Sequence, residues 1–507
     1  MKLSGAQIVV KTLEELGINT VFGYTGNYAM PVFEALERSA LSLVVPTSEV
    51  CGAHEADGYY RASGKVAAVL STSGPGATNL VTGIATAYMD SVPLLAITAN
   101  VPTYKLGKDS FQEVDITGIV TPVTKYAHIV KDVRELEREI KKAYALAVSG
   151  RTAPVLIDIP YDVLLGETEY LSLPLPAYRA PEAKAAEISE AARILNDAER
   201  PALLVGGGAV GAGKAVAALA EKLKAPVFTT LRGIGATDSA RVVGTVGSCA
   251  PRAYNRLYAS ADVILALGTR FSDKMHSKPN KRKYIHIDVD NAELDKIVPA
   301  NCAICARIAD VVPALTAKCN ERREAWYAPV ERPRALSSVV KLAEAVARAD
   351  LRDTVIATDV GNHQIAMLQA LRGKPSEEIV SSLGLGTMGF GLPALIGAMK
   401  ASGKRGILFT GDGSFNMNMN ELATAVEAGL DMSIVIANNR ELGMIKNLER
   451  RRKDGCGELI THTPKVNYAL IARAFGAKGR KASVANIIAL LDSKESGVWV
   501  YDVKIRG

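Results

Sequence analysis

The sequence predicts an α/β protein made of three doubly wound domains with parallel sheets. Two observations lead to this fold class. Short apolar runs of strand length alternate with helical patterns along the whole chain, which is typical of parallel sheets covered by helices. Two polar, proline-containing links divide the alternation into three blocks, and 507 residues suffice for about three domains of ~150 residues each.

The three blocks cover residues 1–168, 187–328 and 338–507, separated by links at Tyr170–Ala186 and Tyr327–Ser337. Each contains apolar, often β-branched segments of four to six residues that we expect to be buried strands. In chain order these are Val66–Leu70, Pro93–Thr98, Pro154–Ile159, Ala202–Val205, Pro226–Thr229, Val263–Leu267, Tyr284–Ile287, Val355–Thr358, Gly406–Thr410 and Met432–Ala437.

Composition excludes several classes of protein. With 48% hydrophobic and 22% charged residues the chain has ordinary globular composition. No segment approaches the roughly 18 apolar residues of a membrane helix. Glu14 and Glu15 interrupt the apolar N-terminal segment, unlike a secretory leader, so we expect a cytoplasmic protein. Cys302 and Cys305 form a C-x-x-C without a second ligand pair, which favours free thiols over a zinc site.

The net charge of +7 is spread along the chain, and the one dense run is Arg450–Lys453. This run is either a solvated helix end or a patch that faces an anionic substrate. No aromatic or reader motif accompanies it, so we expect no nucleic-acid partner.

The stretch from Gly411 to Asn439, "GDGSFNMNMNELATAVEAGLDMSIVIANN", predicts a metal site. It lies between and beyond two predicted strands, with a helical pattern starting near Asn420, and such a crossover makes the two strands parallel. Asp412 and Asn439 should then lie at one sheet edge, where ligands bind. One carboxylate, one amide and a backbone carbonyl suit Mg²⁺, which shares its shell with phosphates and water. The alternative is a pair of ordinary Asp-Gly and Asn-Asn turns.

G-D-G followed by N-N resembles the signature of thiamine-diphosphate enzymes, and the wider chain resembles their acetolactate synthase branch. The most specific segments are "TSGPGATNLVTGIATAYMDSVPLLAIT" (72–98), "FQEVDITGIVTPVTK" (111–125) and "LGTMGFGLPALIGA" (385–398). The resemblance covers nearly the whole chain. It implies pyrimidine-binding, central and diphosphate-binding domains, with Mg²⁺ and thiamine diphosphate (ThDP) as cofactors. It also implies decarboxylation of a small 2-oxoacid with carboligation, in a homodimer or homotetramer with active sites between subunits.

Residue by residue, the resemblance makes Glu49 the catalytic glutamate that bonds the aminopyrimidine ring. It places Phe111, Gln112 and Lys125 at the substrate or its access channel, although Lys125 also fits an ordinary surface lysine. The implied metal ligands are Asp412, Asn439 and the carbonyl of Glu441. The implied cofactor-binding residues are Tyr24, Pro75, Asn79, Val360, Gly361, Asn362, His363, Gly386, Met388, Gly411, Gly413, Ser414, Gly443 and Met444, with Met388 as the wedge that bends the cofactor.

The central block carries a weaker signal. Gly206, Gly207, Gly208 and Gly211 follow a predicted strand as part of a G-x-G-x-x-G pattern, but no acidic residue follows at the ribose-reading distance. By resemblance, Gly268, Arg270 and Asp288 fit an FAD site. Against it, the family's M-H-G segment reads "SCAP" at 248–251, and an aspartate position reads Ala-Arg at 306–307. FAD, an ADP-type ligand and an empty domain all remain open.

Other departures fall near the reacting centre. Asn27 and Tyr28 replace two small residues of the family's G-Y-P-G-G, and Leu448 stands near a tryptophan that affects substrate choice. The leading hypothesis is an acetolactate synthase acting on pyruvate. The alternatives are a related enzyme with a different, more anionic substrate, and a non-catalytic paralogue. Intact Glu49, Asp412 and Asn439 argue against the last.

Overall fold

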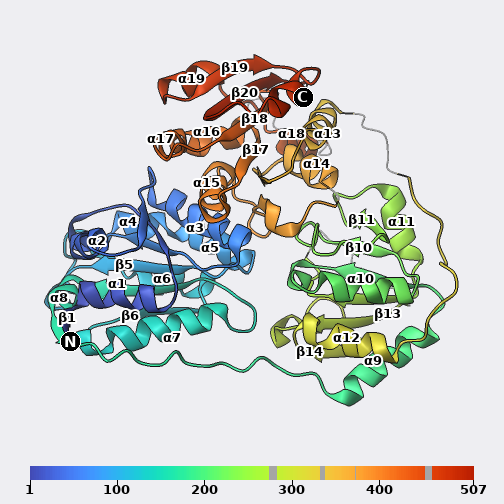
Figure 1. Ribbon diagram of the computed structural model, residues 1–507, viewed down its shortest axis with the longest axis horizontal. Coiled ribbons are helices and arrows are strands. Elements are labelled where there is room, and N and C mark those ends of the chain that lie inside the picture. The colour runs from blue at the N-terminus through green and yellow to red at the C-terminus, as the bar shows by residue number, and fades with distance from the viewer. Residues whose placement is uncertain (273–281, 332–336, 372, 451–459, 507) are drawn as a thin grey trace. The chain divides into compact units, whose positions relative to one another are not determined.

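The computed structural model describes residues 1–272, 282–331, 337–371, 373–450 and 460–506 (Figure 1). Within them the chain forms three six-stranded sheets in which every strand pairing is parallel, which confirms the predicted fold class. The chain divides into two compact units. The first comprises residues 1–178, 337–364 and 378–507, and the second residues 179–336 and 365–377. Of the basic run, residues 451–453 lie outside the described part of the chain.

The first sheet has the strand order β3-β2-β4-β5-β7-β6 and fully buried central strands. A short antiparallel pair, β1 (Lys2–Ser4) and β8 (Glu167–Glu169), lies apart from it. The strands of the six-stranded first sheet are β2 (Thr20–Gly23), β3 (Ser42–Val44), β4 (Ala68–Ser71), β5 (Leu95–Asn100), β6 (Tyr126–Ile129) and β7 (Val155–Pro160). Its helices are α1 (Gly5–Glu15), α2 (Met30–Glu37), α3 (Glu49–Ser63), α4 (Pro75–Asn79), α5 (Val81–Met89), α6 (Ile116–Val120), α7 (Leu136–Val148) and α8 (Tyr161–Leu165).

The C-terminal sheet, in the same unit, has the order β16-β15-β17-β18-β20-β19, which is the same topology as the first sheet. Its strands are β15 (Thr354–Thr358), β16 (Ile379–Ser381), β17 (Arg405–Gly411), β18 (Met432–Asn438), β19 (Lys478–Ala482) and β20 (Val498–Lys504). The helices are α13 (Ser338–Ala347), α14 (Asn362–Ala370), α15 (Gly391–Ser402), α16 (Asp412–Asn418), α17 (Leu422–Glu427), α18 (Gly443–Glu449), α19 (Tyr468–Ala474) and α20 (Ile487–Asp492).

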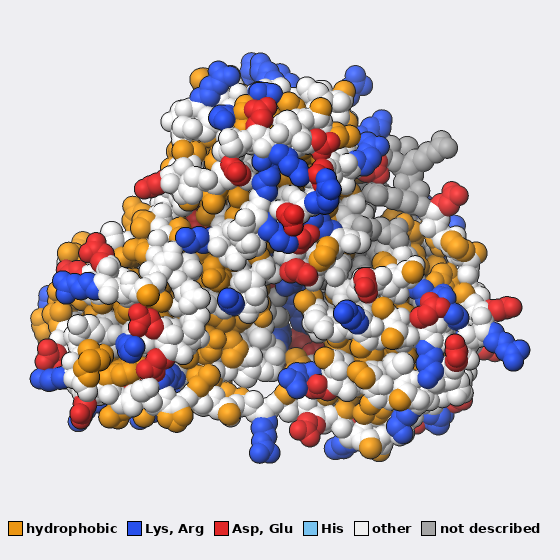
Figure 2. Space-filling model, viewed as in Figure 1, with side chains coloured by type: hydrophobic (Ala, Val, Ile, Leu, Met, Phe, Trp, Pro, Cys, Tyr) orange, Lys and Arg blue, Asp and Glu red, His pale blue; other side chains and the backbone are white. Residues whose placement is uncertain are grey.

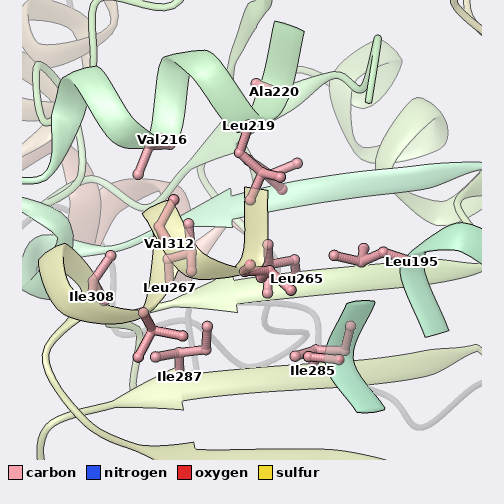
Figure 3. Packing of buried hydrophobic residues seen from close by; sticks show 14 of the residues in the cluster. Leu195, Val216, Leu219, Ala220, Leu265, Leu267, Ile285, Ile287, Ile308 and Val312 are labelled. Carbon is pink, nitrogen blue, oxygen red and sulfur yellow. The ribbon is translucent and has the colours of Figure 1, made fainter. Parts of the chain in front are cut away.

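The central sheet has a different order, β11-β10-β9-β12-β13-β14, which is the dinucleotide-binding topology. Leu265 and Leu267 of β12 and Ile285 of β13 pack against aliphatic side chains of α10 and α12 (Figure 3). Strands are β9 (Pro201–Val205), β10 (Val227–Thr229), β11 (Val242–Thr245), β12 (Val263–Leu267), β13 (Lys283–Asp288) and β14 (Cys302–Cys305). Helices are α9 (Ala185–Asp197), α10 (Gly213–Lys222), α11 (Arg252–Ser260) and α12 (Ile308–Lys318). Neither cysteine of β14 forms a disulfide within the described residues, and their state as free thiols stays a prediction.

Helix α3 joins the two sheets of the first unit by crossing α15 at close range. Most of α3 is buried, because it is covered on several sides rather than along one stripe. A Cβ on Gly58 would overlap the carbonyl of Ala394, and a Cβ on Gly397 would overlap the carbonyl of Glu55. Glycines at both crossing points therefore let the two backbones touch, which fixes α3 and its first residue, Glu49, against the C-terminal sheet.

Strand β19 forms one edge of the C-terminal sheet and carries three basic side chains, Lys478, Arg480 and Lys481. The guanidinium of Arg480 lies 4.5 Å from the centre of the Trp499 ring. Figure 2 shows lysine and arginine side chains gathered over the end where Figure 1 labels β19. Charged residues on an edge strand oppose pairing with other chains.

No helix among the described residues is long and apolar enough to cross a membrane.

Candidate active site

The site begins at the carboxyl ends of β17 and β18. These strands pair in parallel with Gly411 opposite Ala437, so Asp412 and Asn439 emerge at the same sheet edge, as the sequence predicted. The crossover between them differs from the prediction in one respect. It is not a single helix from Asn420, because α16 already starts at Asp412 and a 3₁₀ turn over Met419–Glu421 separates it from α17.

Asp412 is a buried carboxylate surrounded by neutral donors. It is 2% exposed, and its Oδ2 accepts a hydrogen bond from the Thr463 hydroxyl. Burial raises the pKa of Asp412, while the Thr463 hydroxyl and the backbone N–H groups of Gly413 and Asn439 oppose that rise. A cation would stabilise the ionised form of such a group. Its setting therefore fits a metal ligand better than a surface turn.

The other two expected ligands lie beside it. The backbone N–H of Glu441 donates to the side-chain Oδ1 of Asn439 at 3.1 Å, which holds that amide in place. One oxygen of the Glu441 carboxylate, Oε1, forms an ion pair with Lys446, while the other, Oε2, is buried without a partner. An oxygen-only set of this kind is suited to Mg²⁺.

A second glycine-containing loop lies beside the expected metal ligands. The Ser414 hydroxyl donates to the carbonyl of Val360 at 2.9 Å and joins the two loops. Cβ atoms on Gly361 and Gly411 would lie 2.6 and 2.8 Å from Cε1 of His363. The buried His363 has a lowered pKa, about 4, because of burial, and its Nε2 has no hydrogen-bond partner. A neutral imidazole with a free ring nitrogen can donate to a phosphate oxygen.

Met388 extends toward the same place, beside the glycine of the G-D-G motif. A Cβ on Gly413 would lie 2.7 Å from Cδ2 of Leu442 and 3.5 Å from the methyl carbon of Met388. Only a glycine therefore leaves this space open. The remaining expected cofactor residues of this domain lie in loops or at helix starts. Gly386 has a left-handed conformation with φ 74°, Asn362 starts α14, and Gly443 and Met444 start α18.

Sequence reasoning missed Asp359, which ties these loops together. Its carboxylate accepts from the N–H groups of Val360 at 3.0 Å, Gly389 at 2.9 Å and Gly391 at 3.4 Å. Burial raises its pKa to about 6 against those hydrogen bonds. Its position directly after β15, like that of Asp412 after β17, was the available signal. Thr463, also missed, comes from a segment with no recognisable pattern.

Glu49 is held at the first turn of α3 in the same unit. It is 9% exposed, and the Asn79 side-chain amide donates to its Oε2 at 3.0 Å. A Cβ on Gly76, in the helix that starts with Pro75, would lie 3.1 Å from its Oε1. The buried Glu421 carboxylate accepts from the Thr47 N–H at 2.7 Å and fixes the approach to this helix. The arrangement orients the carboxyl and limits its contact with water.

The three residues expected at the substrate, Phe111, Gln112 and Lys125, have different surroundings. Phe111 is 81% exposed, and Gln112, with φ 61°, contacts the backbone of Gly74. The Lys125 ammonium donates to the carbonyls of Leu146 at 2.8 Å and Ser149 at 2.5 Å, at the C-terminal end of α7. These bonds give Lys125 a structural task, which supports the alternative of an ordinary surface lysine.

The residues that depart from the family pattern lie on exposed or partly exposed segments. Asn27 starts a 3₁₀ turn and is exposed, and Tyr28 packs edge-on against the ring of Tyr161, with centroids 5.7 Å apart. Leu448 on α18 is 56% exposed. Tyr24, which was predicted to bind the cofactor, is 39% exposed.

In the central domain, the glycine motif packs directly against a neighbouring loop of the protein. The N–H of Gly206 donates to Leu267 at 2.8 Å, and the N–H of Gly208 donates to Gly268 at 3.1 Å. A Cβ on Gly207 would lie 2.5 Å from Cγ of Arg232. The glycines thus allow close approach of two strand-end loops.

The two polar residues expected at this edge of the central sheet are also engaged within the protein. Oδ1 of Asp288 accepts a hydrogen bond from the N–H of Asp290 at 3.0 Å, and burial raises the Asp288 pKa. Arg270 makes interactions within the described chain. Next to these loops, a cavity of about 490 Å³ lies at the start of α10, lined in part by Lys214, Thr237 and Asp238. No pattern in the sequence predicted this cavity.

Comparison with known proteins gives consistent matches across the chain. Residues 3–119, 188–315 and 359–494 match the N-terminal TPP binding, central and C-terminal TPP binding domains of thiamine pyrophosphate enzymes. The probable acetolactate synthase large subunit of Methanocaldococcus jannaschii is 38% identical over 94% of this chain and 87% of its own length. The acetolactate synthase isozyme 1 large subunit of Escherichia coli is also 38% identical (94% and 88%), and the large subunit from Lactococcus lactis is 36% identical (94% and 87%).

Proposed function

This chain belongs to the thiamine pyrophosphate enzymes, in the group of acetolactate synthase large subunits, and from that premise we propose that it decarboxylates pyruvate and joins the remaining two-carbon unit to a second carbonyl compound. The observation that carries the proposal is the convergence of Asp412, Asn439 and His363 at one sheet edge, with a buried carboxylate and an unpartnered ring nitrogen. We further propose that the enzyme is cytoplasmic and requires Mg²⁺.

Each group of residues has a task in this proposal. Asp412, the Asn439 amide and the Glu441 carbonyl hold Mg²⁺, while the loop of Gly361 and His363 holds the diphosphate. Bound ThDP supplies a carbon nucleophile and an electron sink for decarboxylation. The Asn79 bond orients the Glu49 carboxyl, which exchanges a proton with the ring nitrogen N1′ of the aminopyrimidine.

The direct test is turnover by the purified protein. With ThDP, Mg²⁺ and pyruvate we expect release of carbon dioxide and formation of acetolactate. Glu49→Gln keeps the size of the side chain but removes the exchangeable carboxyl proton, so we expect activity to fall by about 10²–10⁴-fold, the range for loss of a general acid–base group. Full activity of this variant would overturn the role given to Glu49.

A second candidate is a related carboligase with a different 2-oxoacid. It is favoured by Asn27 and Tyr28, which stand where the family has two small residues. A panel of 2-oxoacids decides between the two. Turnover of a more anionic 2-oxoacid in place of pyruvate would select the second candidate, and ThDP binding without any turnover would select a non-catalytic paralogue.

We also propose a homodimer or homotetramer in which Glu49 of one subunit works with the metal site of another, as the family resemblance implies. Mixing two inactive variants tests this arrangement. If the proposal holds, co-expressed Glu49→Gln and Asp412→Asn chains regain activity, because hybrid dimers contain one intact site. Each variant expressed alone is the control, and no recovery in co-purified hybrids would place both residues of a site in one chain.

A further inference from the structure

The segment from Gly107 to Gln112 has an unusual backbone for a surface loop. Asp109 and Gln112 both adopt positive φ, at 51° and 61°, next to Gly107 at 72°. Residues with a Cβ avoid this region because of clashes with the backbone. Two such residues within one short loop need a contact that holds them there.

One carboxylate supplies that contact. Oε1 of Glu113 accepts the N–H of Gly107, and Oε2 accepts the N–H groups of Ser110 at 2.9 Å and Lys108 at 3.3 Å. These bonds, with that of Ser110 as the largest contribution, hold the pKa of Glu113 below its usual range, so the loop binds its ionised form. Successive backbone N–H groups turned toward one anion form a nest, in this case filled by the protein's own side chain.

The ring closed by Glu113 contains Phe111 and Gln112. The Glu113 N–H also donates to the carbonyl of Ser110 at 2.9 Å, so the two residues lie on a short closed turn. The backbone of Gln112 in turn contacts Gly74, because a Cβ there would lie 2.9 Å from the Cα of Gln112. Gly74 directly precedes α4.

Helix α4 ends at Asn79, which is the residue that donates to Glu49. The loop thus contacts the residue that precedes α4, and α4 carries the amide that bonds Glu49. A displacement of the loop would move Phe111 and Gln112 relative to Glu49 without removing any group from the cofactor site.

We propose that Glu113 is a positioning residue whose carboxylate organises residues 107–112 and thereby presents Phe111 and Gln112 to the 2-oxoacid substrate. The substrate part of this inference rests on the proposed function, whereas the order of the loop does not. Glu113 contacts neither substrate nor cofactor in this role.

The test compares Glu113→Ala and Glu113→Gln with the matched control Asp132→Asn. Asp132 is also a partly exposed carboxylate in this domain that accepts a backbone N–H, from Arg134 at 2.9 Å, but it lies outside the loop. Three quantities are measured for each protein: hydrogen exchange of a peptide covering residues 105–114, the kcat and KM for pyruvate, and the affinity for ThDP.

For Glu113→Ala we expect exchange at Gly107, Lys108 and Ser110 to become about tenfold faster, because each N–H loses its acceptor. We expect KM to rise by about tenfold, with kcat and ThDP affinity within about twofold of wild type, since substrate placement and not the cofactor is disturbed. Glu113→Gln should be intermediate, because a carboxamide keeps one accepting oxygen. The control should match wild type in all three.

Unchanged exchange and unchanged KM in Glu113→Ala would overturn the inference, as would an equal effect of Asp132→Asn on the loop. Faster loop exchange with an unchanged KM would overturn the substrate role of the loop. If the wild-type protein turns over no 2-oxoacid while the exchange difference persists, the proposed function fails and Glu113 is still supported as the organiser of the loop.

Discussion

The C-terminal sheet and the central sheet both carry glycine-rich loops at their carboxyl ends, but they use the glycines differently. Cβ atoms on Gly361, Gly411 and Gly413 would meet the side chains of His363, Leu442 and Met388. Cβ atoms on Gly206 and Gly208 would meet the backbone of the loop that contains Gly268. The first set of glycines lets bulky side chains pack against the loops, and the second set lets two backbones touch.

Hydrogen bonding separates the two regions in the same way. Near the C-terminal sheet, Nε2 of His363 is buried without a partner, and Asp412 is surrounded by neutral donors. In the central domain, the N–H groups of Gly206 and Gly208 already donate to backbone carbonyls. A glycine motif therefore does not by itself indicate a ligand site. A buried polar group without a partner adds to the case only together with the loops around it, because Nδ1 of His286 in the central domain is also buried without a partner.

The largest expected difference between the regions concerns their carboxylates. Asp412→Asn should weaken Mg²⁺-dependent ThDP binding by at least about 100-fold, since even residues behind the metal ligands are worth roughly 10–100-fold. Asp288→Asn, at the corresponding edge of the central sheet, should leave this binding unchanged. Calorimetric titration of both variants measures the difference. Equal losses in the two would remove the distinction drawn between the loops.

Replacing a glycine by alanine should lower stability in the central domain and ThDP affinity at the C-terminal sheet. Gly206→Ala forces a Cβ onto the carbonyl of Gly268, so we expect unfolding of the central domain to become easier by about 1–3 kcal/mol, the usual cost of overpacking. Gly411→Ala places its Cβ 2.8 Å from the His363 ring, and we expect its main effect on ThDP affinity. Urea unfolding and cofactor titration are compared for each variant. A loss of ThDP affinity in Gly206→Ala at unchanged stability would contradict the packing role.

The buried histidine should make the stability of the first unit depend on pH. The folded-state pKa of His363, about 4, lies below its ordinary value near 6.5, so the unfolded chain binds more protons. The stabilisation is complete above pH 6.5 and declines as the pH falls toward 4. By pH 5 the loss is about 2 kcal/mol. His363→Gln should lack this slope in urea unfolding, and a slope that survives the substitution would assign the pH dependence to another group.

ThDP offers a control for the same group. Its diphosphate would give His363 an anionic partner and raise the pKa of the ring, so we expect saturating cofactor to flatten the wild-type slope. His286 in the central domain is also buried with a lowered pKa and, like His363, keeps one ring nitrogen without a partner, but it belongs to the second unit, which carries none of the expected ThDP-binding residues. Its contribution should not respond to ThDP.

The smallest expected effect concerns whether the purified protein absorbs light as a flavoprotein does. Because the N–H groups of Gly206 and Gly208 are engaged and Arg232 covers Gly207, we expect the purified protein to lack the yellow absorbance of a flavin. An absorbance spectrum of the protein as purified checks this at once. A stoichiometric flavin would show that the central domain binds a cofactor by groups other than these glycines.

The fold class and the metal edge could be predicted from the sequence because both follow from local patterns. The alternation of apolar runs with helical patterns gives parallel sheets, and the crossover from Gly411 to Asn439 returns the chain to the same edge. The interruption of that crossover between α16 and α17 was not predicted, since the helical pattern alone does not show where a helix is broken. The domain boundaries remain predictions.

The sequence by itself predicted which residues perform the chemistry, because Glu49, Asp412 and Asn439 each stand in a short motif of neighbouring residues. Only the tertiary structure decided which polar groups are already satisfied. Lys125 donates to the carbonyls at the end of α7, and Gly208 donates to Gly268, whereas His363 keeps a free nitrogen. The physical reason is that hydrogen-bond satisfaction depends on partners distant in the sequence, such as Thr463 for Asp412, and no local pattern encodes them.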